Sequence, residues 1–163
     1  VLIAYCHAID SHRWDELDDV FTPDAFIDYT VFGGPKGHYP QIKQFLAEAL
    51  PSFAYAQHNI ATSRITLNGD RAAGRTICTN PVGVREADGG IRHMVYALWY
   101  VDELARTPAG WRITNRREEI SHTLNVPERE AAARRDTQRL VEMLRQAPVT
   151  LPDPAWVRYT PRR

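Results

Sequence analysis

The chain has 163 residues, of which 44% are hydrophobic and 25% are charged, a composition typical of a folded domain and not of a disordered segment. Its twenty basic and twenty acidic residues cancel, so it lacks the basic excess with which nucleic-acid binders neutralise phosphates. Two cysteines make neither a disulfide framework nor a zinc signature, and no apolar run reaches the ~20 residues of a membrane span. We therefore expect a small-molecule substrate, no nucleic acid, no membrane and a reducing, cytoplasmic location.

Helical patterns come first in the chain. Apolar residues at helical spacing predict a helix over residues 1 to about 9. Asp10 and Ser11 are typical N-cap residues and predict a second helix, with Trp14 on its buried stripe. Both helices are expected to cover the same face of a sheet.

A strand, a loop and a third helix follow. Residues 25–31 are apolar and rich in β-forming side chains, which predicts the first strand. Three glycines and a proline within residues 33–37 predict an irregular loop. Pro40 opens the third predicted helix, because the first turn of a helix tolerates the missing N–H of proline.

From residue 56 onward the hydrophobic period becomes that of strands. Four consecutive antiparallel strands are predicted, over residues 56–67, 71–85, 91–106 and 111–122. The charges at 116–119 are interpreted as alternating across the outer face of an edge strand. Helices followed by long strands predict an α+β fold, a cone in which three N-terminal helices pack on a strongly curved antiparallel sheet. A ligand pocket is expected inside the cone.

The chain is predicted to divide into two parts. Residues 1–122 are expected to form the domain itself, and residues 123–163 a C-terminal helix after Pro127 and an extended tail, packed on or near it. The chain starts inside an apolar pattern with no basic leader, so we expect further residues upstream of Val1.

Four residues are candidates for chemistry, and three of them have explicit structural alternatives. Asp10 is either a helix cap or a carboxylate facing the cavity, and His58 is either a structural strand residue or a base. Tyr29 is either a core residue or a hydrogen-bond donor, and Tyr5 alone carries no information.

The pair of Asp10 and His58 has a physical logic of its own. A neutral imidazole is a base suited to proton abstraction near pH 7, and a carboxylate that accepts its other N–H fixes the tautomer. A tyrosine hydroxyl can donate to the oxygen that gains charge as an enolate develops. Elimination or isomerisation next to a carbonyl needs these parts and no cofactor.

Other catalytic signatures are missing from the sequence. The remaining histidines lack the spacing of metal ligands, and neither a phosphate loop nor a Gly-x-Ser-x-Gly elbow occurs. The sequence therefore predicts neither a metal nor a cofactor.

Several short motifs occur together in one order and resemble the SnoaL-like branch of the nuclear transport factor 2-like (NTF2-like) superfamily. The resemblance covers residues 1 to about 120 and is closest in pattern to scytalone dehydratase. Bile-acid 7α-dehydratase and hexachlorocyclohexane dehydrochlorinase are similar at the Asp and the His. The motifs are Tyr5…Asp10-Ser11-x-x-Trp14-Asp15-x-Leu17, Phe21-Thr22-Pro23-Asp24-Ala25, Ile27-Asp28-Tyr29, Gln57-His58-Asn59-Ile60, Leu67-Asn68-Gly69-Asp70 and Gly110-Trp111-Arg112-Ile113.

The resemblance implies roles for the four candidates. It implies that Asp10 orients His58, and that His58 removes a proton from carbon. Tyr29 matches a scytalone dehydratase tyrosine that positions water and the substrate carbonyl. Tyr5 matches a tyrosine of the bile-acid enzyme that assists the leaving hydroxyl. The lyase relatives also suggest a homo-oligomer, a trimer or a dimer.

The chain departs from scytalone dehydratase at several positions, and no residue is matched to the second pocket histidine of that family. Ile9 replaces a second tyrosine, and Met94 and Tyr96 fall where that enzyme has a serine and an asparagine. A more apolar and aromatic pocket is therefore expected, and scytalone is not expected to be the substrate. The predicted substrate-binding residues are Trp14, Phe53, Met94, Tyr96 and Asn115.

These features together predict a cofactor-independent lyase of the dehydratase type. Its Asp–His dyad would act on a small hydroxylated or carbonyl-bearing cyclic molecule, polyketide-like or steroid-like. Three alternatives stay open: an isomerase or cyclase of the same fold, a non-catalytic ligand-binding module, and the small subunit of a ring-hydroxylating oxygenase.

Overall fold

The computed structural model describes residues 1–126. The helical elements are α1 (Leu2–Asp10), α2 (Tyr39–Ala49) and the short 3-10 segments η1 (Trp14–Asp19), η2 (Thr30–Phe32) and η3 (Leu50–Ser52). The strands are β1 (Phe21–Asp28), β2 (Lys36–His38), β3 (Phe53–Ala56), β4 (Asn59–Asn68), β5 (Arg71–Arg85), β6 (Ile91–Thr107) and β7 (Gly110–Leu124). The predicted C-terminal helix and tail lie outside the described residues.

The strands form one mixed sheet in the order β2-β1-β7-β6-β5-β3, with β4 pairing along the other part of β5. Every pair is antiparallel except β1 with β7, which run parallel. A parallel pair needs a long crossover connection, and here the whole chain between β1 and β7 supplies it. The prediction of a purely antiparallel sheet is wrong at this one pair of strands.

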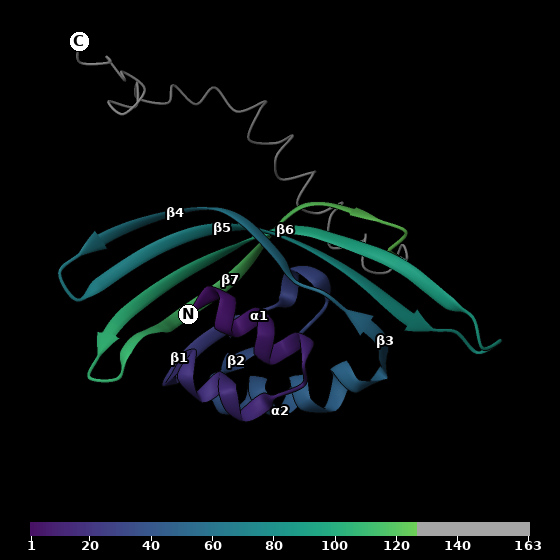
Figure 1. Cartoon of the computed structure of the whole chain (residues 1–163), viewed down its shortest axis with the longest axis horizontal. Helices are drawn as coiled ribbons and strands as arrows, with labels where there is room; N and C mark the ends of the chain where they lie inside the picture. The colour runs from purple at the N-terminus through teal and green to yellow at the C-terminus, as the bar shows by residue number, and fades with distance from the viewer. Residues whose placement is uncertain (127–163) are drawn as a thin grey trace, which may run out of the picture.

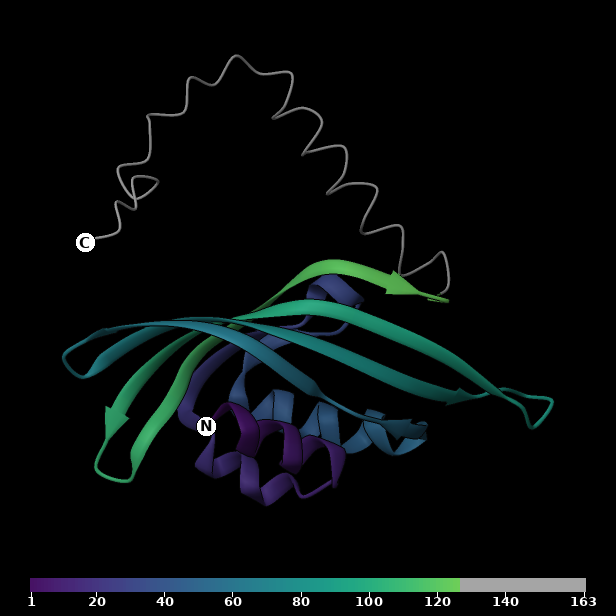
Figure 2. The ribbon, with the colours of Figure 1, turned by 45° about the horizontal axis from the view of Figure 1, so that its top comes forward.

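The sheet arches over the helices. Both views show α1 and α2 beneath its concave face (Figures 1 and 2). Irregular register within the β4–β5 and β6–β7 pairs marks positions where a bulge bends and twists the strands. The expected strong curvature is confirmed, and it lets two short helices close the hollow of a seven-stranded sheet.

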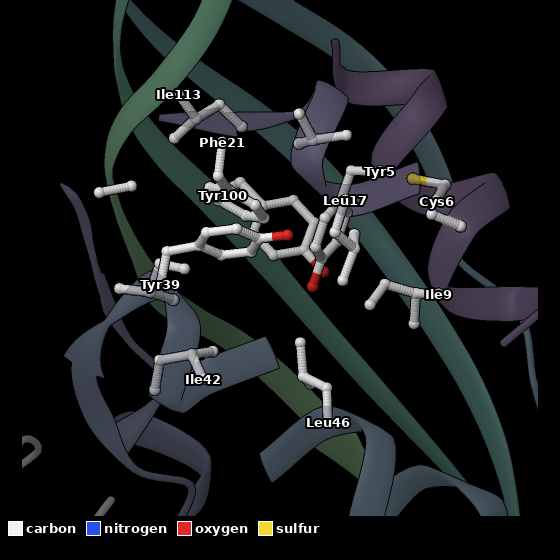
Figure 3. Packing of buried hydrophobic residues seen from close by; sticks show 14 of the residues in the cluster. Tyr5, Cys6, Ile9, Leu17, Phe21, Tyr39, Ile42, Leu46, Tyr100 and Ile113 are labelled. Atoms are coloured by element: carbon white, nitrogen blue, oxygen red, sulfur yellow. The ribbon is translucent and has the colours of Figure 1, made fainter. Parts of the chain in front are cut away.

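The interior between the helices and the sheet is apolar and aromatic. Tyr5 and Ile9 of α1 point into the same interior as Ile42 and Leu46 of α2 (Figure 3). Tyr100 of β6 lies among them and is 2% exposed. Burying each such side chain contributes on the order of 1.5–3 kcal/mol, so this cluster holds the helices against the sheet.

The predicted second helix is only the 3-10 segment η1. The helix α1 ends at Asp10, and His12 turns the chain with a left-handed φ of 54°. The strand β1 starts directly after Val20, which leaves six residues for η1. A segment this short has room for a 3-10 turn but not for an amphipathic α-helix.

Strand boundaries also differ near the proline and glycine residues. The strand β1 begins at Phe21 and not at residue 25, because Phe21 already pairs with Ile113 of β7. The register shifts between Phe21 and Phe26, which accommodates Pro23. The predicted loop 33–37 ends early, since the short strand β2 pairs with β1 from residue 36 onward.

Two further corrections decide where the site lies. The predicted strand 56–67 is interrupted, because β3 ends at Ala56 and β4 starts at Asn59. The strand β7 lies between β1 and β6, so it is an internal strand and not an edge. Its charged run therefore has an inner face, and Arg116 on that face is 0% exposed.

Candidate functional site

A pocket of about 260 Å³ lies under the concave face, bordered by α1, α2 and strands β3, β5, β6 and β7. We call it the inner pocket. Most of its lining is aliphatic or aromatic. Its titratable and amide groups are Tyr5, Tyr29, His58, Asn80, Tyr96 and Glu118. Such a lining buries an organic molecule and fixes its orientation with a few polar contacts.

Asp10 and His58 are in direct contact at one wall of the inner pocket. Nδ1 of His58 lies 2.6 Å from Oδ1 of Asp10, and the backbone N–H of His58 donates to Oδ2 at 2.8 Å. The backbone N–H is available because His58 lies in the gap between β3 and β4, outside the ladder with β5. Asp10 ends α1 and is not the cap of a second helix.

These contacts set the tautomer of His58. A carboxylate can only accept, so Nδ1 carries the hydrogen and Nε2 carries the lone pair. Nε2 lies 3.2 Å from Nδ2 of Asn80, and the other amide atom, Oδ1, is buried with no partner among the described residues. The His58 side chain is 7% exposed. A basic nitrogen is thus held at the pocket wall with its orientation fixed.

A pair of tyrosines lies beside this histidine. The hydroxyls of Tyr5 and Tyr29 are 2.9 Å apart, and the Tyr5 ring meets the His58 ring edge-on at 5.9 Å. Burial raises the pKa of Tyr5 to about 12 and raises the pKa of Tyr29 well above its ordinary value. Both phenols therefore stay protonated. One of their two hydrogens joins the pair, which leaves the other to donate to a ligand.

Glu118 also lines the inner pocket, on the inner face of β7. Burial raises the pKa of its carboxyl to about 8, while the nearby charge of Arg116 opposes the shift. The group therefore carries a proton at neutral pH. A protonated carboxyl in an apolar pocket is a hydrogen-bond donor and an acid, unlike an ordinary surface glutamate.

A buried ion pair lies behind these groups. The Arg116 guanidinium donates to both carboxylate oxygens of Asp102, at 2.7 and 2.8 Å. Its Cζ also lies 4.2 Å from the ring centroid of Tyr5 and 4.1 Å from that of Tyr100. The positive charge is thus matched by one carboxylate and enclosed by aromatic faces.

The structure brings six of the nine predicted site residues to this region. Phe53 and Tyr96 line the inner pocket with Tyr5, Tyr29 and His58, and Asp10 supports His58 from behind. The catalytic and binding roles of all six stay predictions.

Trp14, Met94 and Asn115 are not part of the pocket lining. Trp14 stacks on His12 at 5.2 Å at the start of η1, and Met94 is buried beside Val82, farther along β6. Asn115 precedes inward-facing Arg116, and strand alternation turns it to the opposite face. We therefore leave these three residues out of the candidate site.

Asn80 and Glu118 are pocket residues that the sequence reasoning missed. Glu118 belongs to a run of four charges, which is typical of a solvated face when β7 is taken as an edge strand. The parallel pairing of β1 with β7 places it inside, and no local pattern predicts that pairing. Asn80 is one polar residue in a long strand and gives no signal of its own.

A larger hollow of about 760 Å³ lies at the N-terminal end of α1. Its lining is mostly aliphatic, and its polar members are Ser63, Thr76 and Asp102. Ser63 and Thr76 bond each other at 2.9 Å, and Asp102 is committed to Arg116. The arrangement has no base with a free lone pair among the described residues, so the inner pocket is the candidate site despite its smaller volume.

Two features are absent from the described residues, 1–126. No helix there is long and apolar enough to cross a membrane. No three His, Cys, Asp or Glu side chains in that range are grouped to hold a metal ion.

A curved sheet closed by helices around a mostly apolar pocket with a few polar groups is the NTF2-like architecture. Residues 1–117 match the SnoaL-like domain, and the protein belongs to that family. An uncharacterized protein of Mycobacterium tuberculosis, Rv2910c, is 45% identical over 120 residues, which cover 72% of this chain and 79% of that protein.

Solved structures agree with this assignment. A candidate aromatic-ring hydroxylase from Novosphingobium aromaticivorans aligns with a TM-score of 0.69 at 25% identity, covering 80% of this chain and 90% of that one. A candidate scytalone dehydratase from the same organism aligns at 0.67 and 16% identity, covering 77% and 83%. A hexachlorocyclohexane dehydrochlorinase from Novosphingobium barchaimii aligns at 0.63 and 15% identity, covering 77% and 84%. The two likenesses at lower identity show a shared fold, and the named activities belong to those proteins.

Proposed function

We propose that the protein is a cofactor-independent lyase that removes a proton next to a carbonyl group in the inner pocket. The observation that supports this most strongly is the 2.6 Å contact between His58 and Asp10, which leaves Nε2 as the basic nitrogen. The proposed substrate is a small cyclic molecule that bears a carbonyl and a hydroxyl group. The mostly apolar lining suits such a molecule.

The proposed reaction starts with transfer of the α proton. Nε2 of His58 takes the hydrogen, and the C–H electron pair moves into an enolate. The Asp10 carboxylate then stabilises the imidazolium, because it already accepts the Nδ1 hydrogen. The Tyr5–Tyr29 pair donates its remaining hydrogen to the oxygen that gains charge. Collapse of the enolate expels a leaving group from the β carbon and forms the double bond.

Asn80 has a specific place in this scheme. In the free protein its Nδ2 faces the Nε2 lone pair of His58 at 3.2 Å. A substrate C–H must replace this contact before the proton moves. Turning the amide over then presents the otherwise unpaired Oδ1 to the N–H of the imidazolium. Asn80 is therefore proposed as a positioning residue for His58.

Proton abstraction can be tested without knowing the natural substrate. β-Tetralone is a bicyclic ketone with acidic α hydrogens, and NMR follows their exchange in deuterium oxide. We expect the protein to catalyse this exchange, and His58→Ala to lower the rate on the order of 10²–10⁴-fold. His93→Ala is the matched control, because His93 is likewise a hydrogen-bonded strand histidine, paired with Tyr55, but lies outside the inner pocket.

The results separate the candidate functions. Equal exchange rates in His58→Ala and the parent protein would refute the proposed base. Exchange without elimination from any β-hydroxy ketone would favour an isomerase, in which the proton returns to another carbon, or a cyclase, in which the enolate carbon forms a new carbon–carbon bond.

A further inference from the structure

Glu118 is the one carboxyl group among the described residues that line the inner pocket, and the proposed reaction does not use it. It lies on the inner face of β7 and pairs across the ladder with Tyr100 of β6. His58, Tyr5 and Tyr29 line the same pocket. A ligand bound there lies among all four side chains.

The surroundings of Glu118 keep it neutral. The charge of Arg116 acts on Glu118, but Arg116 binds Asp102 through two hydrogen bonds, so the pair adds little net charge. Burial is the larger effect on the Glu118 pKa and outweighs the attraction of Arg116. The titratable and charged groups near it, from α1 and strands β1, β5, β6 and β7, are Tyr5, Asp28, Tyr29, Cys78, Tyr100, Asp102 and Arg116.

The proton of Glu118 has no acceptor within residues 1–126. Its carboxyl makes no hydrogen bond with any described side chain or backbone group, whereas the two tyrosines bond each other and Asp10 bonds His58. Its accessible surface faces the inner pocket. A neutral carboxyl left in this state in an apolar wall is available to donate to a bound molecule.

We infer that Glu118 is the general acid that protonates the leaving oxygen, and that the substrate of the proposed lyase carries a hydroxyl group on the carbon β to its carbonyl. This assignment rests on the proposed function. His58 takes the α proton, the enolate electrons form the C=C bond, the C–O bond breaks, and the oxygen takes the Glu118 proton and leaves as water. Solvent then carries the proton from His58 back to Glu118, so the net change is the loss of one water.

The division of labour between Glu118 and the tyrosines follows from their acidity. An enolate oxygen needs a donor that keeps its hydrogen, and a phenol whose pKa is about 12 suits that task. A departing hydroxide needs a full proton, which a carboxyl with a pKa of about 8 transfers far more readily. A halide needs no proton, so this acid favours oxygen over halogen as the leaving group.

Two substrates that differ only in the leaving group test the inference. The aldol of benzaldehyde and acetone loses water, its acetate ester loses acetate, and both give benzylideneacetone, which is followed by its absorbance. We expect Glu118→Gln to lower the rate for the aldol at least ~100-fold, as expected for the loss of a positioned acid. The acetate, which leaves without a proton, should keep its rate within a few-fold.

Matched variants complete the design. Glu118→Asp restores a proton and should recover part of the aldol rate. Glu119→Gln is the control, because Glu119 faces the other way and pairs with Arg75 at 2.9 Å. Equal losses on the aldol and the acetate in Glu118→Gln would overturn the acid role.

Failure of the proposed function is distinguishable from failure of this inference. If the parent protein neither exchanges β-tetralone nor eliminates either substrate, the lyase proposal falls. Infrared difference spectra at pH 7 still test the acid: a protonated carboxyl band present in the parent and missing from Glu118→Gln supports it. A parent spectrum without that band would overturn it.

Discussion

Asp10 accepts two hydrogen bonds from a single residue, one from the backbone N–H of His58 and one from its ring. The carboxylate therefore fixes both the position of the chain and the rotation of the imidazole. An amide in place of the carboxylate can also present an N–H to Nδ1, and then the wrong ring nitrogen keeps the proton.

Asp10→Asn should therefore lower β-tetralone exchange on the order of 10²–10⁴-fold while leaving the fold intact. Nitrogen NMR of the His58 ring should show a change of tautomer in the variant. Retention of the parent tautomer with a normal rate would contradict the role of Asp10 as the orienting group.

Glu118 makes the stability of the protein depend on pH. Its carboxyl has an ordinary pKa of 4.5 in the unfolded chain and about 8 in the folded protein. Between these values folding takes up a proton, so the free energy of unfolding falls as pH rises from about 4.5 to about 8. Below that window both states hold the proton, and above it both have lost it.

Glu118→Gln removes this dependence. Relative to the parent, the variant should gain stability steadily from pH 5 to pH 8, by up to a few kcal/mol, since one pKa unit corresponds to about 1.4 kcal/mol. Urea unfolding at several pH values measures the difference. A constant difference across this range would show that Glu118 titrates normally in the folded protein.

At the scale of elements, the turn between β1 and β2 holds Tyr29 in place. The backbone N–H of Gly34 donates to the carbonyl of Tyr29 at 3.1 Å. A Cβ on Gly34 would lie 2.9 Å from the Cβ of Tyr29 and 3.1 Å from its carbonyl oxygen. Neither atom belongs to a flexible side-chain end, so the turn itself would have to shift.

Gly34→Ala is accordingly expected to cost about 1–3 kcal/mol of stability and to move the Tyr29 hydroxyl away from Tyr5. The aldol elimination rate should fall with it. Gly74→Ala is the control, because a Cβ there meets nothing closer than 3.6 Å. Thermal unfolding and elimination rates of the two variants give the comparison.

Local sequence predicts the long strands of the hairpins, but it does not predict which strands lie next to them in the sheet. The strand β5 spans residues 71–85 as predicted, and β6 starts at the predicted residue 91, because glycine turns and alternating side chains act over a few residues. The parallel partner of β7 comes from about ninety residues earlier, and no short-range pattern specifies it. That pairing decides that Arg116 and Glu118 face inward.

The residues of the candidate site also fall into two groups, those named from the sequence and those placed by the sheet. Asp10, His58, Tyr5 and Tyr29 are the four catalytic candidates of the sequence analysis, and the structure brings them together, while their roles stay predictions. Glu118 and Asn80 enter the pocket through strand register, which depends on the whole sheet. Residues placed by register are the ones that reading the sequence alone missed.

For the molecule as a whole, the Asp102–Arg116 pair is a charged contact inside an aromatic core. Arg116 is 0% exposed and Asp102 is 2% exposed. Removing one partner leaves the other buried without compensation, a change that commonly costs about 3–5 kcal/mol. Replacing both partners with apolar side chains of similar size removes that penalty.

Asp102→Leu should thus destabilise the protein far more than the double replacement of Asp102→Leu with Arg116→Met. The free energies of unfolding of the two single variants and the double variant form a cycle that measures the coupling. If the double variant were as unstable as the sum of the single ones, the pair would act as two independent residues.

The interruption between β3 and β4 has a consequence for how such a protein changes over time. One continuous strand, β5, pairs with both pieces, so the sheet stays in register whatever occupies the two intervening positions. His58 occupies one of them, and its amide hydrogen goes to Asp10 instead of a strand. Mutation at residues 57 and 58 can exchange one reactive group for another while the sheet keeps its shape. New chemistry can therefore arise here without a change of fold.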